Sequence, residues 1–231
     1  MQNKDRLPEE KRKARTRQDL KTLYLILSDE FGPLEDWWPA ATPFERIAGA
    51  ILVQQTRWEN VDRVLSDLEQ RELMSPEALA AVEIEELEQI VRPTGFYRNK
   101  ARSLKAVAEY FSINPIGEMS KKQKSKLRAE LIDLRGVGDE TADVILLYVA
   151  GKPAFVVDAY AKKLCVCLGI EGSSAGLQKI FEDSLCVDVR SYQHYHTLIV
   201  EHGKRYCQRK ACDTCAVARL RRTISQARQL D

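Results

Sequence analysis

The feature that most constrains the fold is a helical spacing of apolar residues that recurs in one segment after another. In the segment 42–55, Thr42 is the expected N-cap, Pro43 takes the first helical position and Glu45 completes a capping box. One stretch, residues 154–157, looks extended, but it is too short to build a sheet. We therefore predict an all-α fold. The same spacing predicts further helices over residues 58–70, 75–82, 85–91, 97–111, 121–134, 139–151, 159–169, 175–185 and 191–203.

Composition and the first residues exclude several classes of protein. Of the 231 residues, 44% are apolar and 30% are charged, as is usual for globular proteins. The N-terminal residues are highly charged and contain no apolar core, so we expect no secretory signal. No apolar run approaches the length of a membrane span. We therefore expect a cytoplasmic protein that does not enter membranes, and we expect it to be a monomer.

Positive charge is concentrated at both ends of the chain, although the net charge is only +2. Residues 4–21 contain eight Lys or Arg and four Asp or Glu, and residues 202–231 contain eight Lys or Arg and two Asp. Clusters of this kind suit a polyanion, because phosphates respond to local rather than net charge. An ordinary solvated surface with a frayed tail explains the same charges equally well.

The six cysteines fall into two groups, and a disulfide framework is not expected inside a cell. Three of them have apolar neighbours, which predicts small core residues: Cys165, Cys167 and Cys186. The other three lie in the polar, basic segment CQRKACDTC with the spacing C-x4-C-x2-C: Cys207, Cys212 and Cys215. Such spacing is typical of metal ligands, because a tight turn can direct several thiolates at one centre.

A glycine turn between two helical segments is the most informative motif. Gly136, Val137 and Gly138 separate the segments 121–134 and 139–151. Because glycine has no Cβ atom, the turn can adopt positive φ and approach another surface closely. Its N–H groups and those of the next helix would then point outwards and bind an anion such as a DNA backbone phosphate. A simple packing turn is the alternative.

Several sequence elements together carry a family resemblance. They are the segment ILVQQT, the segment RPTGFYRNKA, the glycine turn, the aspartate in VVDAY, and HGKRYC before the cysteine cluster. Over residues 35–215 the chain resembles the endonuclease III superfamily of helix-hairpin-helix DNA glycosylases. The tryptophan pair in DWWPA, the aromatic Trp58 after the Q-x-T element and a glutamate in the hairpin helix resemble most the 3-methyladenine DNA glycosylase III branch.

The resemblance implies the type of reaction and its catalytic carboxylate. Bifunctional members of the superfamily carry a lysine at the position of Glu140, and a carboxylate cannot form their Schiff base. We therefore expect a monofunctional enzyme that removes the base with water. By family likeness Asp158 is the catalytic group, which stabilises an oxocarbenium-like sugar and orients or deprotonates the water. The alternatives are a first-turn acid for Glu140 and a helix N-cap for Asp158.

The resemblance also implies base flipping and a stacking pocket. Gln54 matches the family's wedge residue, although a polar side chain at a helix end is common. The pocket would contain Glu140 and the three tryptophans of the chain, Trp37, Trp38 and Trp58, unless these rings belong to the core. Indole rings attract cationic bases, which favours alkylated purines such as 3-methyladenine. The expected partner is double-stranded DNA that contains damaged bases.

The cysteine cluster departs from the family pattern. Iron–sulfur members use C-x6-C-x2-C-x5-C, whereas here the first spacer is two residues shorter and Arg221 takes the fourth position. A [4Fe–4S] cluster with a non-cysteine ligand or a remote thiol, zinc with His202, and no metal all remain open. Arg209 and Lys210 in the same loop are expected to face DNA phosphates.

The resemblance implies two helical lobes with a DNA-binding groove between them. A helical barrel with the hairpin would span residues 35–152, and residues 1–34 and 153–231 would form the other lobe with Asp158 and the cysteine loop. Two alternative functions remain open: a non-catalytic helix-hairpin-helix DNA-binding protein, and an endonuclease III-like glycosylase and lyase for oxidised pyrimidines.

Overall fold

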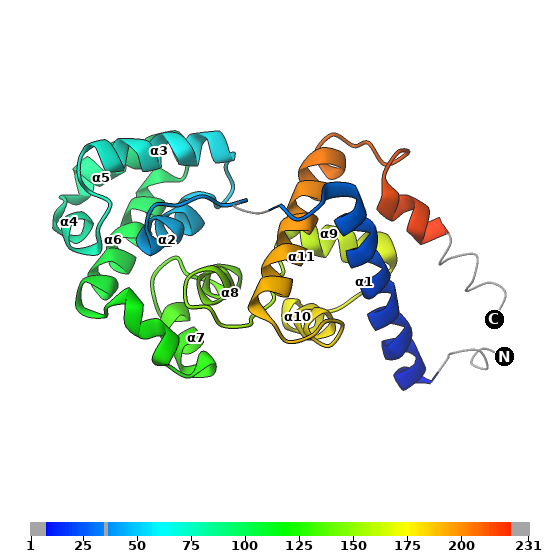
Figure 1. Cartoon of the computed structure of the whole chain (residues 1–231). Coiled ribbons are helices and arrows are strands. Elements are labelled where there is room, and N and C mark those ends of the chain that lie inside the picture. The colour runs from blue at the N-terminus through cyan, green and yellow to red at the C-terminus, as the bar shows by residue number, and fades with distance from the viewer. Residues whose placement is uncertain (1–7, 35–36, 223–231) are drawn as a thin grey trace, which may run out of the picture. The chain divides into compact units, whose positions relative to one another are not determined.

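The computed structural model describes residues 8–34 and 37–222, and their regular structure is helical throughout (Figure 1). No β-strand occurs in these ranges, which confirms the predicted all-α fold. Residues 151–158, which include the stretch that looked extended, adopt no regular structure. The remaining residues, which belong partly to the two basic segments, lie outside the described part of the chain. No helix within the described ranges combines the length and the apolar character that a bilayer span requires.

The chain divides into two compact units, which differ in how they are assembled from the sequence. Trp38–Lys152 is continuous, whereas the other unit combines Met1–Trp37 with Pro153–Asp231. The continuous unit contains the glycine turn, and the discontinuous unit contains Asp158 and the cysteines.

The continuous unit is built around one central helix, α6 (Tyr97–Ile113). This helix buries Leu104, Val107, Ala108 and Phe111, which follow one another at helical intervals, and it packs against α2, α4 and α5. Each of the buried Leu, Val and Phe side chains contributes roughly 1.5–3 kcal/mol on burial. The other elements are α2 (Pro43–Leu52), α3 (Trp58–Gln70), α4 (Pro76–Ala81), α5 (Ile84–Val91), η1 (Arg92–Thr94), η2 (Ile116–Lys121), α7 (Lys124–Ile132) and α8 (Asp139–Tyr148).

The start of α2 follows the predicted capping pattern, with one difference. The Thr42 hydroxyl accepts a hydrogen bond from the backbone N–H of Glu45 at 3.1 Å, and Pro43 opens the helix. The Glu45 carboxylate accepts at 2.6 Å from the backbone N–H of Ala41, one residue before the N-cap. These bonds fix where α2 begins. They therefore also fix the position of Gln54, which lies in the loop after the other end of the helix.

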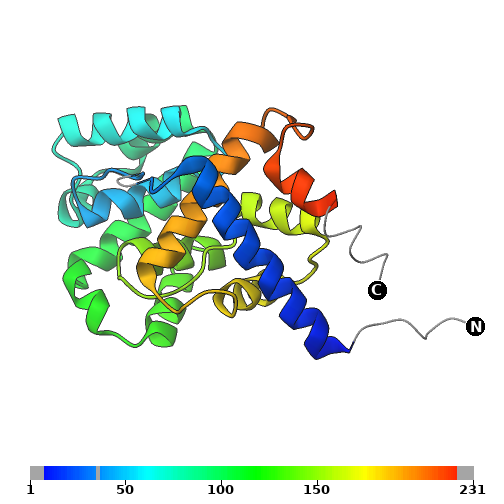
Figure 2. The same ribbon diagram turned by 45° about the vertical axis from the view of Figure 1, so that its right-hand side comes forward.

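The discontinuous unit contains α1 (Glu9–Phe31), α9 (Ala159–Leu168), α10 (Ser174–Glu182), α11 (Val189–His202) and the π-helical turn η3 (Gly203–Cys207), and residues 216–222 are also helical. Helix α1 lies beside α11 in both views (Figures 1 and 2). No helix was predicted over its residues, because its charged surface hides a weak apolar pattern. Its buried positions are Leu20, Leu23 and Leu27.

An aromatic cluster forms the core of this unit. Phe155 stacks on Phe181 with ring centroids 4.3 Å apart, and Tyr195 packs edge-on against both rings. The Tyr195 hydroxyl donates a hydrogen bond to the Leu20 carbonyl at 2.8 Å, which ties α11 to α1. This packing fixes the position of α11, and with it the next residue, His196.

Candidate functional site

The glycine turn between α7 and α8 is a helix-hairpin-helix motif in which the two glycines have different roles. Gly136 has φ +78°, and a Cβ atom there would lie 2.0 Å from the Ser103 hydroxyl oxygen, so only glycine fits. Gly138 has φ −92° with nothing within 4 Å of a Cβ atom, and it serves as the N-cap of α8. Of the two glycines, Gly136 is therefore the one that uses the predicted freedom to adopt positive φ.

Val137 is an internal part of this turn. Its side chain is buried, and its backbone N–H donates to the Leu134 carbonyl at 3.1 Å. In this conformation Val137 therefore offers a phosphate neither its side chain nor its N–H group. The first turn of α8, which follows it, carries N–H groups that have no partner within the helix itself.

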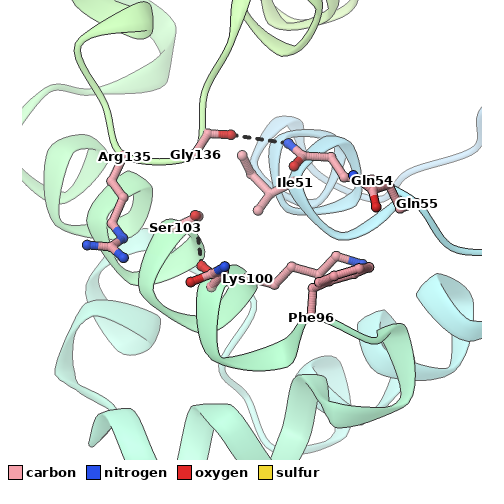
Figure 3. A pocket seen from close by; sticks show the side chains of 9 residues that line it. Ile51, Gln54, Gln55, Phe96, Lys100, Ser103, Arg135 and Gly136 are labelled. Carbon is pink, nitrogen blue, oxygen red and sulfur yellow. Dashed lines mark hydrogen bonds between the residues drawn. The ribbon is translucent and has the colours of Figure 1, made fainter. Parts of the chain in front are cut away.

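Gln54 is bound to the hairpin. It lies just beyond the end of α2, and its side-chain amide donates to the Gly136 carbonyl at 3.1 Å and to the Thr141 hydroxyl at 3.2 Å. The structure thus brings the predicted wedge residue and the glycine turn together within one unit. The amide is exposed, and these hydrogen bonds hold it at the edge of a cavity (Figure 3).

The cavity has a volume of about 400 Å³ and a mixed polar and apolar lining (Figure 3). Phe96 lines it and is 64% exposed, with φ +47° at the start of α6. An exposed aromatic residue in the left-handed region is uncommon and often functional. Sequence reasoning missed Phe96, although its place directly after a glycine in RPTGFYRNKA was a usable signal. The lining residues are Ile51, Gln54, Gln55, Phe96, Asn99, Lys100, Ser103, Arg135 and Gly136.

Two basic residues border this cavity and differ in exposure. Arg135 is exposed on the glycine turn, whereas Lys100 is buried and donates from Nζ to the Thr94 carbonyl at 2.7 Å. Burial lowers the pKa of Lys100 to about 8. Lys100 therefore supports the η1 turn before Phe96, and Arg135 supplies the accessible charge.

Glu140 is the second residue of α8 and is exposed. Its neighbour Asp139 forms an ion pair with Arg128 at 2.8 Å, and Arg128 also binds Asp143 at 2.8 Å. Two acids in the first turn complement the positive end of the helix dipole. The first turn of this helix carries no amine.

Trp38 and Trp58 contact each other in the continuous unit. Their rings meet edge-to-face with centroids 5.8 Å apart, and Tyr148 packs on Trp38 with centroids 5.5 Å apart. A Cβ atom on Gly49 would lie 3.3 Å from Trp38 and 3.5 Å from Trp58, so helix α2 has a glycine where the indoles approach it. Trp58 remains 36% exposed.

Asp158 caps α9 in the discontinuous unit. Its Oδ1 accepts a hydrogen bond from the Ala161 N–H at 2.7 Å, so the N-cap role proposed from sequence is present. Burial raises the pKa of Asp158 to about 6, although the N–H groups of Ala161 and Tyr160 lower it. The carboxyl therefore titrates closer to neutral pH than an ordinary aspartate does.

His196 is a titratable residue that lies beside Asp158. Its Nε2 lies 3.9 Å from Oδ2 of the aspartate, and burial lowers the pKa of His196 to about 4. The imidazole is therefore neutral at physiological pH, and the contact is not an ion pair. Sequence reasoning did not link these residues, which lie 38 positions apart in the chain.

Trp37 belongs to the same unit as Asp158 and contacts its neighbour. Its ring meets His196 edge-on with centroids 6.2 Å apart, and its Nε1 donates to Glu201 at 2.7 Å. Lys204 lies 5.1 Å from the centre of the indole. The three tryptophans therefore divide between the units, with Trp38 paired to Trp58 and Trp37 beside His196.

The cysteines differ in exposure, and two expectations about them are wrong. Cys165 is a buried core residue as predicted, but Cys186 is exposed and Cys167 is half-buried. Both were assigned to the core because apolar neighbours in sequence do not reveal which way a side chain points.

The cysteine loop follows η3. Cys215 is buried with its Sγ 3.0 Å from Nε2 of His202, whereas Cys212 is exposed and Cys207 is half-buried. Arg209 and Lys210, between the first two cysteines, are exposed. Across the described part of the chain, no three His, Cys, Asp or Glu side chains are arranged to hold a metal ion as they stand.

Comparisons with known proteins agree on a family. The family model of the HhH-GPD superfamily base excision DNA repair proteins matches residues 48–184. A protein of Methanocaldococcus jannaschii with the provisional name DNA repair glycosylase is 42% identical over 203 residues, which cover 84% of this chain and 92% of its own length.

Two solved structures show the same similarity. The 3-methyladenine DNA glycosylase of Helicobacter pylori, bound to 1,N6-ethenoadenine, superposes with a TM-score of 0.69 at 29% identity, covering 82% of this chain and 97% of the other. An endonuclease III in a non-covalent complex with DNA gives a TM-score of 0.74 at 25% identity, covering 88% of this chain and 94% of the other.

Proposed function

This chain belongs to the HhH-GPD superfamily of base excision DNA repair proteins and is a DNA glycosylase, and from this premise we propose that it removes alkylated purines, 3-methyladenine foremost, by hydrolysis alone. The observation that carries the proposal is Glu140, an acid in the first turn of the hairpin helix. A carboxylate cannot form an imine with C1′. Water therefore replaces the base at C1′, and the DNA strand stays intact. The likeness to a 3-methyladenine DNA glycosylase supports the substrate class.

Asp158 is the proposed catalytic residue. Cleavage of the N-glycosidic bond gives the sugar oxocarbenium character, and an ionised carboxylate stabilises that charge. The same carboxylate accepts a proton from the attacking water. Its position at the N-cap of α9 fixes its orientation, and burial keeps the pKa near the pH at which it must act.

DNA is proposed to meet the continuous unit at the hairpin. The N–H groups at the start of α8 bind a backbone phosphate, and Arg135 adds positive charge beside them. Gln54 enters the duplex where the damaged nucleotide leaves it, and the exposed Phe96 on the same cavity is a second inserting side chain. Base flipping requires such groups, because the gap in the stack must be filled.

The flipped base is proposed to stack on indole rings, with Trp37, Trp38, Trp58 and Glu140 as the pocket residues. Methylation at a ring nitrogen leaves the purine cationic, and such a base gains about 1–2 kcal/mol from a desolvated indole face. The positive charge also makes the base a good leaving group. Recognition can then depend on stacking and charge rather than on many hydrogen bonds.

The cysteine loop is proposed to hold a metal centre through Cys207, Cys212 and Cys215, with a [4Fe–4S] cluster as the first candidate and zinc as the second. Three thiols in one short basic loop are the donor set that soft metals prefer. When bound, the centre would order the loop that carries Arg209 and Lys210.

Release of bases from methylated duplex DNA tests the proposal, with each released base identified by mass. We expect 3-methyladenine as the main product and no strand breaks until alkali or heat is applied. A protein–DNA adduct trapped by borohydride, or release of pyrimidines from oxidised duplex DNA and of no base from methylated DNA, would favour an endonuclease III-like lyase. The Asp158→Asn variant serves as the inactive control.

A further inference from the structure

One face of helix α9 is turned towards the cysteine loop. Tyr160, Lys163 and Cys167 lie on this face, because they follow one another at helical intervals of three and four residues. A Cβ atom on Gly203 would lie 2.1 Å from the Tyr160 ring, so the ring packs directly on the backbone of η3. The Gln208 side chain also donates a hydrogen bond to the Tyr160 hydroxyl.

Cys167, at the other end of this face, interacts with all three cysteines of the loop. It lies within electrostatic range of Cys212 and Cys215, and Cys207 lies within range of Cys167 as well as of the other two. Lys163 interacts electrostatically with both Cys167 and Cys207. Four thiols from two separate segments therefore converge on one region.

Cys165 shows that this arrangement is specific to one face of the helix. Two residues along a helix is a turn of about 200°, so Cys165 and Cys167 point in nearly opposite directions. Cys165 is buried in the core within range of Tyr195, and burial is the cause that raises its pKa. The segment CVC thus supplies one core thiol and one thiol that faces the loop.

We infer that Cys167 is the fourth thiolate of a metal centre whose other ligands are Cys207, Cys212 and Cys215. The inference rests on the proposed metal centre and is independent of the proposed substrate. Four thiols are the donor set of a tetrahedral zinc site and of a [4Fe–4S] cluster, and each thiol releases its proton on coordination. The loop must close on α9 for this, because its cysteines do not form a ready-made group of three. Cys212 is the exposed member of the set.

This assignment links the metal to the catalytic helix. Helix α9 is capped by Asp158 and ends one residue beyond Cys167, so a centre held by Cys167 would join this helix to the loop with Arg209 and Lys210. His202 is the competing fourth ligand, because its Nε2 lies 3.0 Å from the Cys215 sulfur. In our assignment it hydrogen-bonds a ligand and does not bind the metal.

The test measures metal directly on the full-length protein purified without air. Iron, sulfide and zinc are determined per chain for the parent, for Cys167→Ser and for the matched control Cys165→Ser, which alters the same helix. We expect the parent and Cys165→Ser to carry one centre per chain and Cys167→Ser to lose most of it. Iron with sulfide identifies a cluster and zinc without sulfide identifies a zinc site, and either result supports the inference when it depends on Cys167.

A second measurement uses thiol labelling by a maleimide in the native state. Cys167 and the three loop cysteines should be protected in the parent and become reactive after a chelator removes the metal, whereas the exposed Cys186 should react throughout. Full metal content in Cys167→Ser together with its loss in His202→Gln would overturn the assignment. A metal-free parent with all loop thiols reactive would overturn it too. A metal-loaded parent that releases no base would instead refute the proposed function alone.

Discussion

The Asp158 side chain affects the free energy of unfolding in two opposite ways, through its N-cap hydrogen bond and through its buried charge. As an N-cap it accepts the Ala161 N–H, which stabilises α9, but its charge is buried beside a neutral His196. Burial favours the protonated form of Asp158. As the pH rises, the unfolded chain therefore loses this proton at a lower pH than the folded protein does. A carboxylate that destabilises its own protein at neutral pH is typical of a functional site.

Asp158→Asn should therefore lose most base release and yet raise the free energy of unfolding at pH 7.5. The folded pKa of about 6 lies above the ordinary 3.8. The buried charge of Asp158 therefore leaves the free energy of unfolding unchanged below about pH 4 and lowers it increasingly between pH 4 and 6. Above pH 6 the loss stays constant at roughly 1–3 kcal/mol. Asparagine keeps the N-cap without the charge. Denaturant unfolding of the parent and the variant at pH 4 and at pH 7.5 measures the difference in their free energies of unfolding. A difference that is the same at both pH values would contradict the prediction.

Phe96 provides a second test at the scale of one side chain. It is 64% exposed, so Phe96→Ala should change the free energy of unfolding by less than about 0.5 kcal/mol. If the ring enters the duplex, the same change should lower base release from duplex DNA several-fold while affecting single-stranded DNA less. Ile113→Ala is the matched control, because Ile113 is 80% exposed at the other end of the same helix α6. Equal losses in both variants would remove Phe96 from the mechanism.

At the scale of the element, the hairpin depends on one glycine for its shape. Gly136 lies against Ser103 of α6 at positive φ, and its carbonyl accepts from Gln54, so the turn is held from two other segments. Gly138 lacks both constraints. Two glycines that look equivalent in sequence are therefore unequal in the folded unit.

Gly136→Ala should destabilise the protein by about 2 kcal/mol or more, because the left-handed backbone and the contact with Ser103 both oppose a Cβ atom. Gly138→Ala should change the free energy of unfolding by no more than about 0.5–1 kcal/mol. The change can be stabilising, because alanine restricts the unfolded chain more than glycine does. Thermal unfolding of the two variants compares them directly. Similar losses for both would show that the turn tolerates no side chain at all.

At the scale of the whole molecule, charge is distributed unevenly over the sequence. Its basic residues are concentrated in residues 4–21 and 202–231, although the net charge is only +2. For the loop, the described residues Arg209 and Lys210 are exposed. A DNA-binding role for such residues has a quantitative signature, because each phosphate contact releases counterions.

The double variant Arg209→Gln, Lys210→Gln should reduce the slope of log K against log salt concentration by about 2 for duplex DNA, since each phosphate contact contributes about 0.9. Affinity should fall most at low salt and about equally for damaged and undamaged DNA. Lys179→Gln is the control, because this exposed lysine pairs with Asp183 on α10. An unchanged slope would place the loop away from the phosphates.

Local patterns in the sequence determined the helices, the capped start of α2, the N-cap at Asp158 and the glycine turn. These features depend on neighbours within a few residues, so spacing and residue type are enough to predict them. The weak apolar pattern of α1 was an exception, because its three buried leucines are outnumbered by charges and the helix packs against the distant helices α10 and α11.

Tertiary packing alone decided which distant side chains meet. It set Cys167 facing the loop and Cys165 facing the core, placed His196 beside Asp158, and left Phe96 exposed on the cavity with Gln54. The physical reason is that a residue's conformation is set mainly by its chain neighbours, whereas its contacts follow from how whole helices pack. Sequence patterns could therefore name the chemistry of the chain, but not the partners of each side chain.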